Sequence, residues 1–177
     1  MTTINRRHWG FVVGAGALAL GAGAWWQDRL SAAHAATIPP ADGPLPQPLT
    51  LLDGKMLSNT ELAGRSVVLN FWAPWCPPCV KEMPELDRFA RSTAGRNTVV
   101  IGLAIDEEPA VRKWIAAHPV GFPISILGYA GLAWAGRLGN DSKVLPFSVV
   151  YDRSRKLVQH KLGPTSEAEL AGWIRTS

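Results

Sequence analysis

Apolar residues follow two patterns along this chain, short continuous runs and runs with helical spacing. Residues 67–72 and 98–105 are almost entirely apolar, as strands buried on both faces must be. Helical spacing is clearest over residues 107–117, where Trp114 lies on the expected core face. These patterns predict strands that alternate with helices.

Turn and capping signals place the remaining elements. Asp53-Gly54 predicts a hairpin within residues 49–57, and residues 58–62 are expected to form a short capped helix. Ser166 is expected to cap a last helix. The other expected elements are a helix over 77–93, a short strand or loop over 122–127, a helix over 129–138, and an antiparallel strand pair over 147–151 and 157–162. This order predicts a mixed sheet flanked by helices.

Composition and charge agree with one folded domain behind a leader. The hydrophobic fraction of 47% and the 8 tryptophans exclude a disordered chain. The formal net charge is +4, of which Arg6, Arg7 and Arg29, set against Asp28, supply half. The remaining charge is too small and too scattered to indicate a nucleic-acid partner.

The first 36 residues are typical of an export or anchoring segment. Two arginines precede an uncharged stretch from Trp9 to Trp26, which approaches the length of about 20 residues that spans a bilayer. We expect an uncleaved inner-membrane anchor with the arginines inside. The alternative is a signal segment cleaved near Ala35, which would leave a soluble periplasmic protein. Both place the folded domain outside the cytoplasm.

A proline-rich stretch follows this segment. Residues 37–48 contain five prolines and predict a semi-rigid, extended spacer. The expected organisation is therefore an anchor or signal segment over 1–36, a linker over 37–48 and one domain over 49–177.

The two cysteines of the chain form a Cys76-Pro77-Pro78-Cys79 motif where a buried strand should turn into a helix. A helix N-terminus directs unpaired N–H groups and a partial positive charge at the first sulfur, which favours its thiolate. The second cysteine lies one turn further on, within reach of a mixed disulfide formed by the first. Prolines are tolerated there because their missing N–H has no intrahelical partner.

Other uses of a cysteine pair fit less well. A structural disulfide closing so short a loop removes little entropy from the unfolded chain. A zinc site needs about four ligands, and the sequence has no second cysteine pair. Haem attachment requires histidine directly after the second cysteine, where Val80 stands. A redox-active pair remains, and no cofactor is expected.

The chain resembles the thioredoxin-fold family, and more narrowly its TlpA-like members, the membrane-associated thiol-disulfide oxidoreductases that include cytochrome c maturation thioredoxins. The resemblance is carried by residues 70–79, by residues 81–84, which end in Pro84, and by residues 145–147. It implies a three-layer α/β/α thioredoxin-like fold with a mixed central sheet, here with an added N-terminal β-hairpin. It also implies a cis peptide bond between Leu145 and Pro146, beside the disulfide.

The motif assigns chemical roles. Cys76, at the helix tip, is expected to be the attacking thiolate, and Cys79 the resolving thiol in exchange through a mixed disulfide. Glu82 lies one helical turn after Cys79 and matches the acidic position of TlpA-like proteins, so we expect it to accept the Cys79 proton. The alternative is a solvated glutamate paired with Lys81 or Arg88.

Three residues are expected to bind substrate. The resemblance implies that Pro146 abuts the sulfurs and that Leu145 presents its backbone as a short edge to an extended substrate, a form of β-augmentation. Trp75 is expected to give an apolar contact, whereas Trp72 is expected in the core.

The resemblance implies an enzyme that reduces disulfides of exported proteins, with apocytochrome c or oxidase subunits as candidate substrates and a membrane electron donor for its re-reduction. One alternative is a thiol-dependent peroxidase of the redoxin type, whose usual proline and threonine are replaced here by Leu69 and Ala73. Another is a copper-binding oxidase-assembly chaperone, for which His160 is the sole distant candidate ligand.

Overall fold

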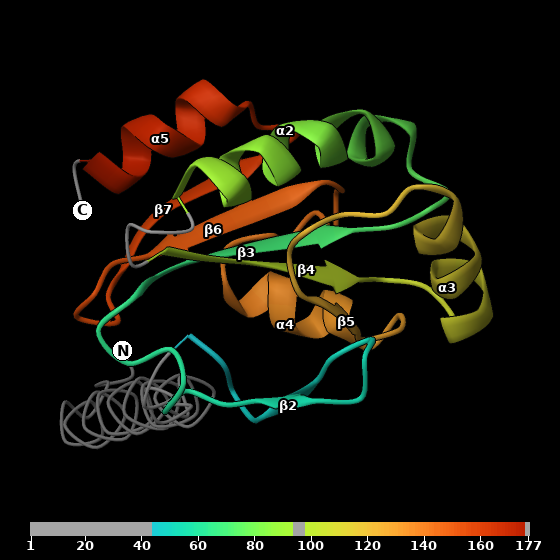
Figure 1. The fold of residues 1–177 in the computed structure, drawn as a ribbon, viewed down its shortest axis with the longest axis horizontal. Helices are drawn as coiled ribbons and strands as arrows, with labels where there is room; N and C mark the ends of the chain where they lie inside the picture. The colour runs from blue at the N-terminus through green and yellow to red at the C-terminus, as the bar shows by residue number, and fades with distance from the viewer. Residues whose placement is uncertain (1–43, 94–97, 176–177) are drawn as a thin grey trace, which may run out of the picture. The chain divides into compact units, whose positions relative to one another are not determined.

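The computed structural model describes residues 44–93 and 98–175 of the chain (Figure 1). The predicted anchor or signal segment and the first part of the predicted linker lie outside these residues. Within the described ranges, no helix has both the length and the apolar character needed to cross a membrane.

A five-stranded mixed sheet forms the centre of the domain, in the order β5-β4-β3-β6-β7. The central strand β3 pairs in parallel with β4 and antiparallel with β6, and β5 is parallel to β4. The β6–β7 pair is antiparallel, as predicted. The strands span Ser66–Trp72 (β3), Thr98–Ala104 (β4), Ile124–Ile126 (β5), Phe147–Tyr151 (β6) and Leu157–Leu162 (β7).

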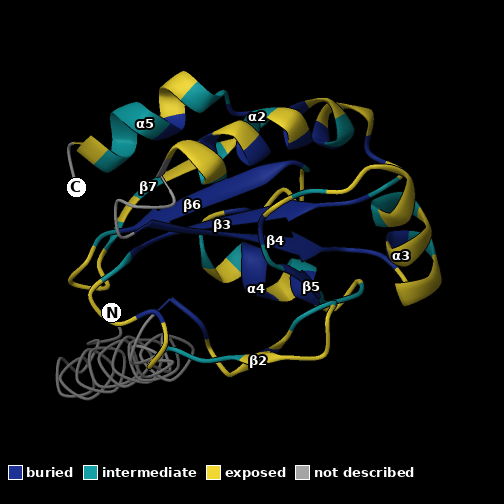
Figure 2. Ribbon diagram, in the orientation of Figure 1, coloured by how far each residue is buried: buried dark blue, intermediate teal, exposed yellow. Residues whose placement is uncertain are grey.

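Helices cover both faces of this sheet, so the predicted three-layer fold is confirmed (Figures 1 and 2). Side chains of β3 alternate between two buried clusters, Leu69 and Phe71 on one face and Val68 and Trp72 on the other. Trp134 covers the first face, and Leu86, Val111 and Leu170 cover the second. The helices span Pro77–Thr93 (α2), Glu108–Ala117 (α3), Gly131–Arg137 (α4) and Glu167–Arg175 (α5).

The predicted N-terminal hairpin is present. Strands β1 (Leu49–Thr50) and β2 (Met56–Leu57) pair antiparallel, and Gly54 adopts the positive φ of 83° that the connecting turn requires. An antiparallel bridge between Leu51 and Ser125 attaches this hairpin to β5. The hairpin therefore covers part of an otherwise open sheet edge.

Leu45 shows that the packed domain begins before residue 49. Its side chain is 1% exposed and belongs to the same buried cluster as Leu69 and Phe71. Its backbone N–H donates to Asn59 Oδ1 at 3.0 Å, and its carbonyl accepts from Asn59 Nδ2 at 2.7 Å. The last residues of the predicted linker are thus fixed to the domain.

The prediction of a short helix over residues 58–62 is wrong. The chain there forms consecutive turns, with hydrogen bonds that span three residues, such as Glu61 N–H to the Ser58 carbonyl at 3.2 Å. Ser58 and Glu61 do contact each other as in a capping box. Leu62 is the one buried side chain of this stretch, so a helix would have no apolar face to pack.

Candidate active site

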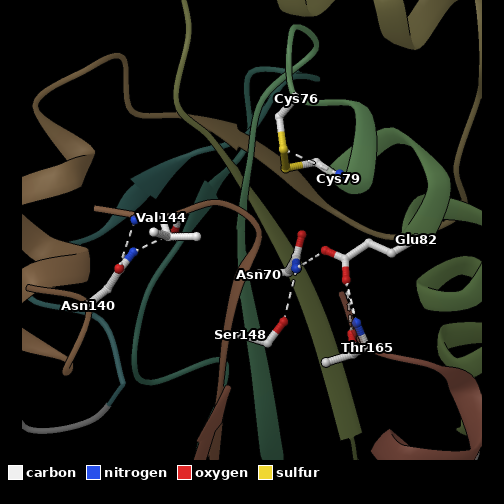
Figure 3. The surroundings of a disulfide bond; sticks show 8 residues. All are labelled: Asn70, Cys76, Cys79, Glu82, Asn140, Val144, Ser148 and Thr165. Carbon is white, nitrogen blue, oxygen red and sulfur yellow. Dashed lines mark hydrogen bonds between the residues drawn. A yellow bond between two sulfur atoms is a disulfide. The ribbon is translucent and has the colours of Figure 1, made fainter. Parts of the chain in front are cut away.

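A disulfide joins Cys76 to Cys79 at the start of α2, with an S–S distance of 2.05 Å (Figure 3). Strand β3 delivers the pair, and a turn closed by Cys76 N–H and the Ala73 carbonyl at 3.1 Å leads into the helix. The Cys76 carbonyl then accepts the N–H of Val80 at 3.1 Å. Cys76 is therefore the N-cap residue of α2.

The Cys76 sulfur takes the place of a capping side chain. Cys79 N–H donates to Cys76 Sγ at 3.3 Å, the contact that an N-cap oxygen would make with the third helical residue. Pro77 and Pro78 have no N–H, so Cys79 supplies the first backbone donor of the helix. Cys76 is 4% exposed and Cys79 is 0% exposed, so Cys76 is the more exposed of the two.

The peptide bond between Leu145 and Pro146 is cis, as the resemblance implied. Phe147, the next residue, pairs with Phe71 near the end of β3. Because β6 runs antiparallel to β3, the first residue of β6 and the last residues of β3 lie at the same end of the strands. Leu145 and Pro146, which directly precede β6, therefore lie at the same end of the sheet as the disulfide, which follows β3.

Glu82 lies in the interior and not in solvent. It is 2% exposed, and its carboxylate accepts hydrogen bonds from Asn70 Nδ2 at 2.7 Å, Thr165 N–H at 2.7 Å and Thr165 Oγ1 at 3.2 Å (Figure 3). Arg88 pairs instead with Glu85 and Glu167. The alternative of a solvated ion pair is therefore wrong for Glu82.

Burial dominates the electrostatics of this carboxyl group. Loss of hydration raises the pKa of Glu82 above its ordinary value, although the three hydrogen bonds and the charge of Lys161 act in the opposite direction. A buried carboxyl group with a raised pKa, one helical turn from a cysteine, is a candidate for proton transfer.

Figure 3 draws Asn70 below the disulfide, with its side chain beside the Glu82 carboxylate. Its amide nitrogen donates to Glu82 and, at 2.9 Å, to Ser148 Oγ. Its Oδ1 is buried and has no hydrogen-bond partner among the described residues, and Figure 3 shows this oxygen on the side that faces the sulfurs. This oxygen is thus a buried acceptor that none of the described residues uses.

The sequence did not indicate Ser148 or Thr165. They lie 78 and 83 residues from the motif residues they contact, and single hydroxyl residues carry no local signal. Only the pairing of β6 with β3 and the position of the loop before α5 bring them to Glu82 and Asn70.

The apolar residues near the site divide into exposed and buried ones. Trp75, directly before Cys76, is 56% exposed, and Val144, before Leu145, is 46% exposed. Trp72 is fully buried in the core, as expected. Across residues 44–93 and 98–175, no group of three or more potential metal-ligating side chains is placed to hold a metal ion.

Comparison with known proteins gives consistent matches. The Redoxin family model matches residues 33–173. The chain is 30% identical over 128 residues to the thiol-disulfide oxidoreductase ResA of Bacillus cereus, with 72% of each chain covered. It is 28% identical over 116 residues to sporulation thiol-disulfide oxidoreductase A of Bacillus subtilis, covering 62% of this chain and 67% of that protein.

A solved structure shares the fold of the domain. A secreted Mycobacterium tuberculosis disulfide oxidoreductase, described as homologous to E. coli DsbE, superposes with a TM-score of 0.59 at 25% identity. The match covers 73% of this chain and 95% of that one.

Proposed function

Because the Redoxin family model spans most of its length, this chain belongs to that family and is a thiol-disulfide oxidoreductase, and we propose that it reduces disulfides of exported proteins as a membrane-associated, TlpA-like enzyme. The observation that carries this proposal is the Cys76–Cys79 disulfide at the N-terminus of α2, one helical turn from the buried Glu82. This arrangement supports a role for Cys76 as the reactive thiol at the helix tip and for Glu82 as a proton acceptor in the interior.

The proposed reaction begins from the reduced pair. The Cys76 thiolate attacks one sulfur of a substrate disulfide, which forms a mixed disulfide and releases the other substrate sulfur as a thiolate. Cys79, deprotonated, then attacks the Cys76 sulfur and releases the second substrate thiol. Two electrons have passed to the substrate, and the domain is left with the disulfide seen here. A membrane electron donor would reduce it again.

Glu82 is proposed to accept the proton of Cys79 in the second step. In this oxidised structure, the Glu82 carboxylate hydrogen-bonds to Asn70 and Thr165 and to neither sulfur. Catalytic contacts often form only in the reacting complex, so the separation seen here is compatible with this role.

Substrates are proposed to dock over the Cys76 sulfur, the more exposed of the two. Trp75 offers an apolar surface beside Cys76, and Leu145 offers its backbone beside Pro146. An extended segment could therefore pair with Leu145 while its disulfide reaches Cys76.

Export is supported by the leader pattern and by one relative. An uncharged stretch between arginines precedes the domain, and the similar M. tuberculosis oxidoreductase is described as secreted. We therefore assign the domain to the periplasmic side of the inner membrane, with cleavage near Ala35 as the alternative to an anchor. Apocytochrome c and oxidase subunits are the candidate substrates.

The two cysteines should differ in reactivity. We expect Cys76 in Cys79→Ser to be alkylated about tenfold faster or more at neutral pH than Cys79 in Cys76→Ser, because the helix N-terminus stabilises the Cys76 thiolate. Cys79 is also fully buried. Alkylation rates measured against pH on both reduced variants check this, and a faster Cys79 would reverse the assigned roles.

The reduction potential tests the direction of electron flow. We expect a value below about −180 mV, because Pro77 and Pro78 offer no N–H to the Cys76 thiolate and the reduced form is therefore less stabilised. Equilibration of the purified protein against glutathione measures it. Pro78→Ala restores one N–H in the first turn and should raise the potential. A wild-type value above about −180 mV would indicate an oxidase or isomerase.

A further inference from the structure

The loop between α4 and β6 is organised by one buried side chain, Asn140, which the mechanism above does not use. Asn140 is 0% exposed. Its Oδ1 accepts the backbone N–H of Val144 at 3.0 Å, and its Nδ2 donates to the Val144 carbonyl at 2.8 Å (Figure 3). The amide thus occupies both backbone groups of Val144, as a neighbouring strand would.

Asn140 is held in place by the end of α4. Gly139 has a φ of 106°, and its N–H donates to the Gly136 carbonyl at 3.0 Å. The N–H of Asn140 donates to the Ala135 carbonyl at 3.0 Å. This pair of bonds is the glycine-containing Schellman motif of helix C-termini. Since Ala135 is fully buried, the motif ties Asn140 to the hydrophobic core.

Next to Val144, whose backbone groups are bound by Asn140, Leu145 has unpaired backbone groups. Its N–H and carbonyl have no hydrogen-bond partner among the described residues. Pro146 has no N–H, and its carbonyl accepts Gly163 N–H at 2.9 Å. Leu145 and Pro146 form a bend before β6 begins at Phe147. Since the Val144 groups are taken by Asn140, the N–H and carbonyl of Leu145 are the unpaired backbone groups directly before Pro146.

We propose that Asn140 is a positioning residue that aims the backbone groups of Leu145 at an extended substrate and restricts strand pairing to that single residue. This inference rests on the docking mode proposed above. It further defines the substrate class, a disulfide in an extended segment that has a free backbone N–H at one fixed position from its cysteine. A folded disulfide without such a segment would be a poor substrate.

The test compares a peptide substrate with one that cannot form strand hydrogen bonds. Asn140→Ala should lower kcat/KM for a fluorogenic disulfide-linked peptide by about tenfold, chiefly through KM, the size expected for one or two misaligned hydrogen bonds. Reduction of hydroxyethyl disulfide, which has no peptide group, should remain within about twofold, because it needs no backbone pairing. Equal losses on both substrates would overturn the proposal in favour of a general structural role.

The chain contains a matched control. Asn59 makes the same two bonds to the backbone of Leu45, whose side chain belongs to a different buried cluster from the one that contains the two cysteines. Asn59→Ala should leave unchanged the ratio of kcat/KM for the peptide to kcat/KM for hydroxyethyl disulfide. A selective loss of activity on the peptide in this variant would overturn the proposal. Asn140→Asp, which keeps the acceptor for Val144 N–H, provides a milder change if the alanine variant does not fold, and should shift the ratio in the same direction.

N-methylated peptides separate this inference from the proposed function. In the wild type, N-methylation at one position near the cysteine should lower kcat/KM, and Asn140→Ala should abolish that sensitivity. If no position is sensitive in the wild type, docking on Leu145 is itself wrong. If one position is equally sensitive in both proteins, docking is supported and the role of Asn140 is refuted.

Discussion

Replacing Glu82 by glutamine is expected to slow the resolution of a preformed mixed disulfide by about 10² to 10⁴, the usual range for loss of a general base. The first attack by Cys76 should be nearly unchanged, because its sulfur is contacted by Cys79 N–H and not by Glu82. Single-turnover release of a substrate thiol from the mixed disulfide on Cys76 measures the resolving step alone. A resolution rate that is unchanged at every pH would remove Glu82 from the mechanism.

The helix provides a matched control for this substitution. Glu85 lies three residues further along α2, is partly exposed and pairs with Arg88, so Glu85→Gln should leave the rate unchanged. Glutamine at position 82 has one acceptor oxygen in place of two, so its NH₂ group would face either the Thr165 donors or the Asn70 amide donor, which costs roughly 1–3 kcal/mol of stability. Folding of the variant should therefore be verified by denaturation, so that a loss of structure is not taken for a loss of catalysis.

The raised pKa of Glu82 determines two pH dependences. Resolution in the wild type should slow as the pH falls through this pKa, because the protonated acid accepts no proton, and Glu82→Gln should lose that dependence. For stability, the folded state holds the proton more tightly than the unfolded chain does. The contribution is therefore full below the ordinary value of 4.5 and is lost as the pH rises through the raised pKa. The unfolding free energy of the wild type relative to Glu82→Gln should decrease over that interval.

The parts of the fold that the sequence predicted are those with a strong local signal. Strands β3 and β4 are buried on both faces, so they show as apolar runs. The start of α2 follows from two prolines that suit only a first helical turn. The stretch from Ser58 to Leu62 carries a capping signal that is also real in the structure. Its helix does not form, because a cap adds about 1 kcal/mol and apolar packing supplies most of the rest.

The residues of the candidate active site also divide into those with a local sequence signal and those without one. Cys76, Cys79 and Glu82 belong to one contiguous motif and could be predicted together. The partners that hold Glu82 could not, because Thr165 reaches it from 83 residues away. Asn140 was also missed, since its contacts with Val144 depend on how α4 ends and not on a recognisable motif.

Substitution of Cys79 by serine is expected to abolish disulfide reduction and to trap substrates on Cys76. The hydroxyl of serine is not a thiolate and cannot attack the mixed disulfide. The backbone N–H of residue 79, which contacts Cys76 Sγ, remains in place, so the first step should proceed. Turnover should fall to background, while a mixed disulfide between Cys76 and the substrate accumulates to one per enzyme molecule.

Proteins held on Cys76 would then identify the physiological substrates. The variant should be expressed with its full leader and captured from membrane and periplasmic fractions, with release by a thiol reductant as the criterion for a covalent complex. Cys76→Ser is the matched control and should trap nothing, because Cys79 is 0% exposed and a folded substrate cannot reach it. Trapping on Cys79 in that control would exchange the two roles. Trapped proteins that are cytoplasmic would contradict the proposed export, whereas exported proteins with paired cysteines would support a reductase on the periplasmic side of the membrane.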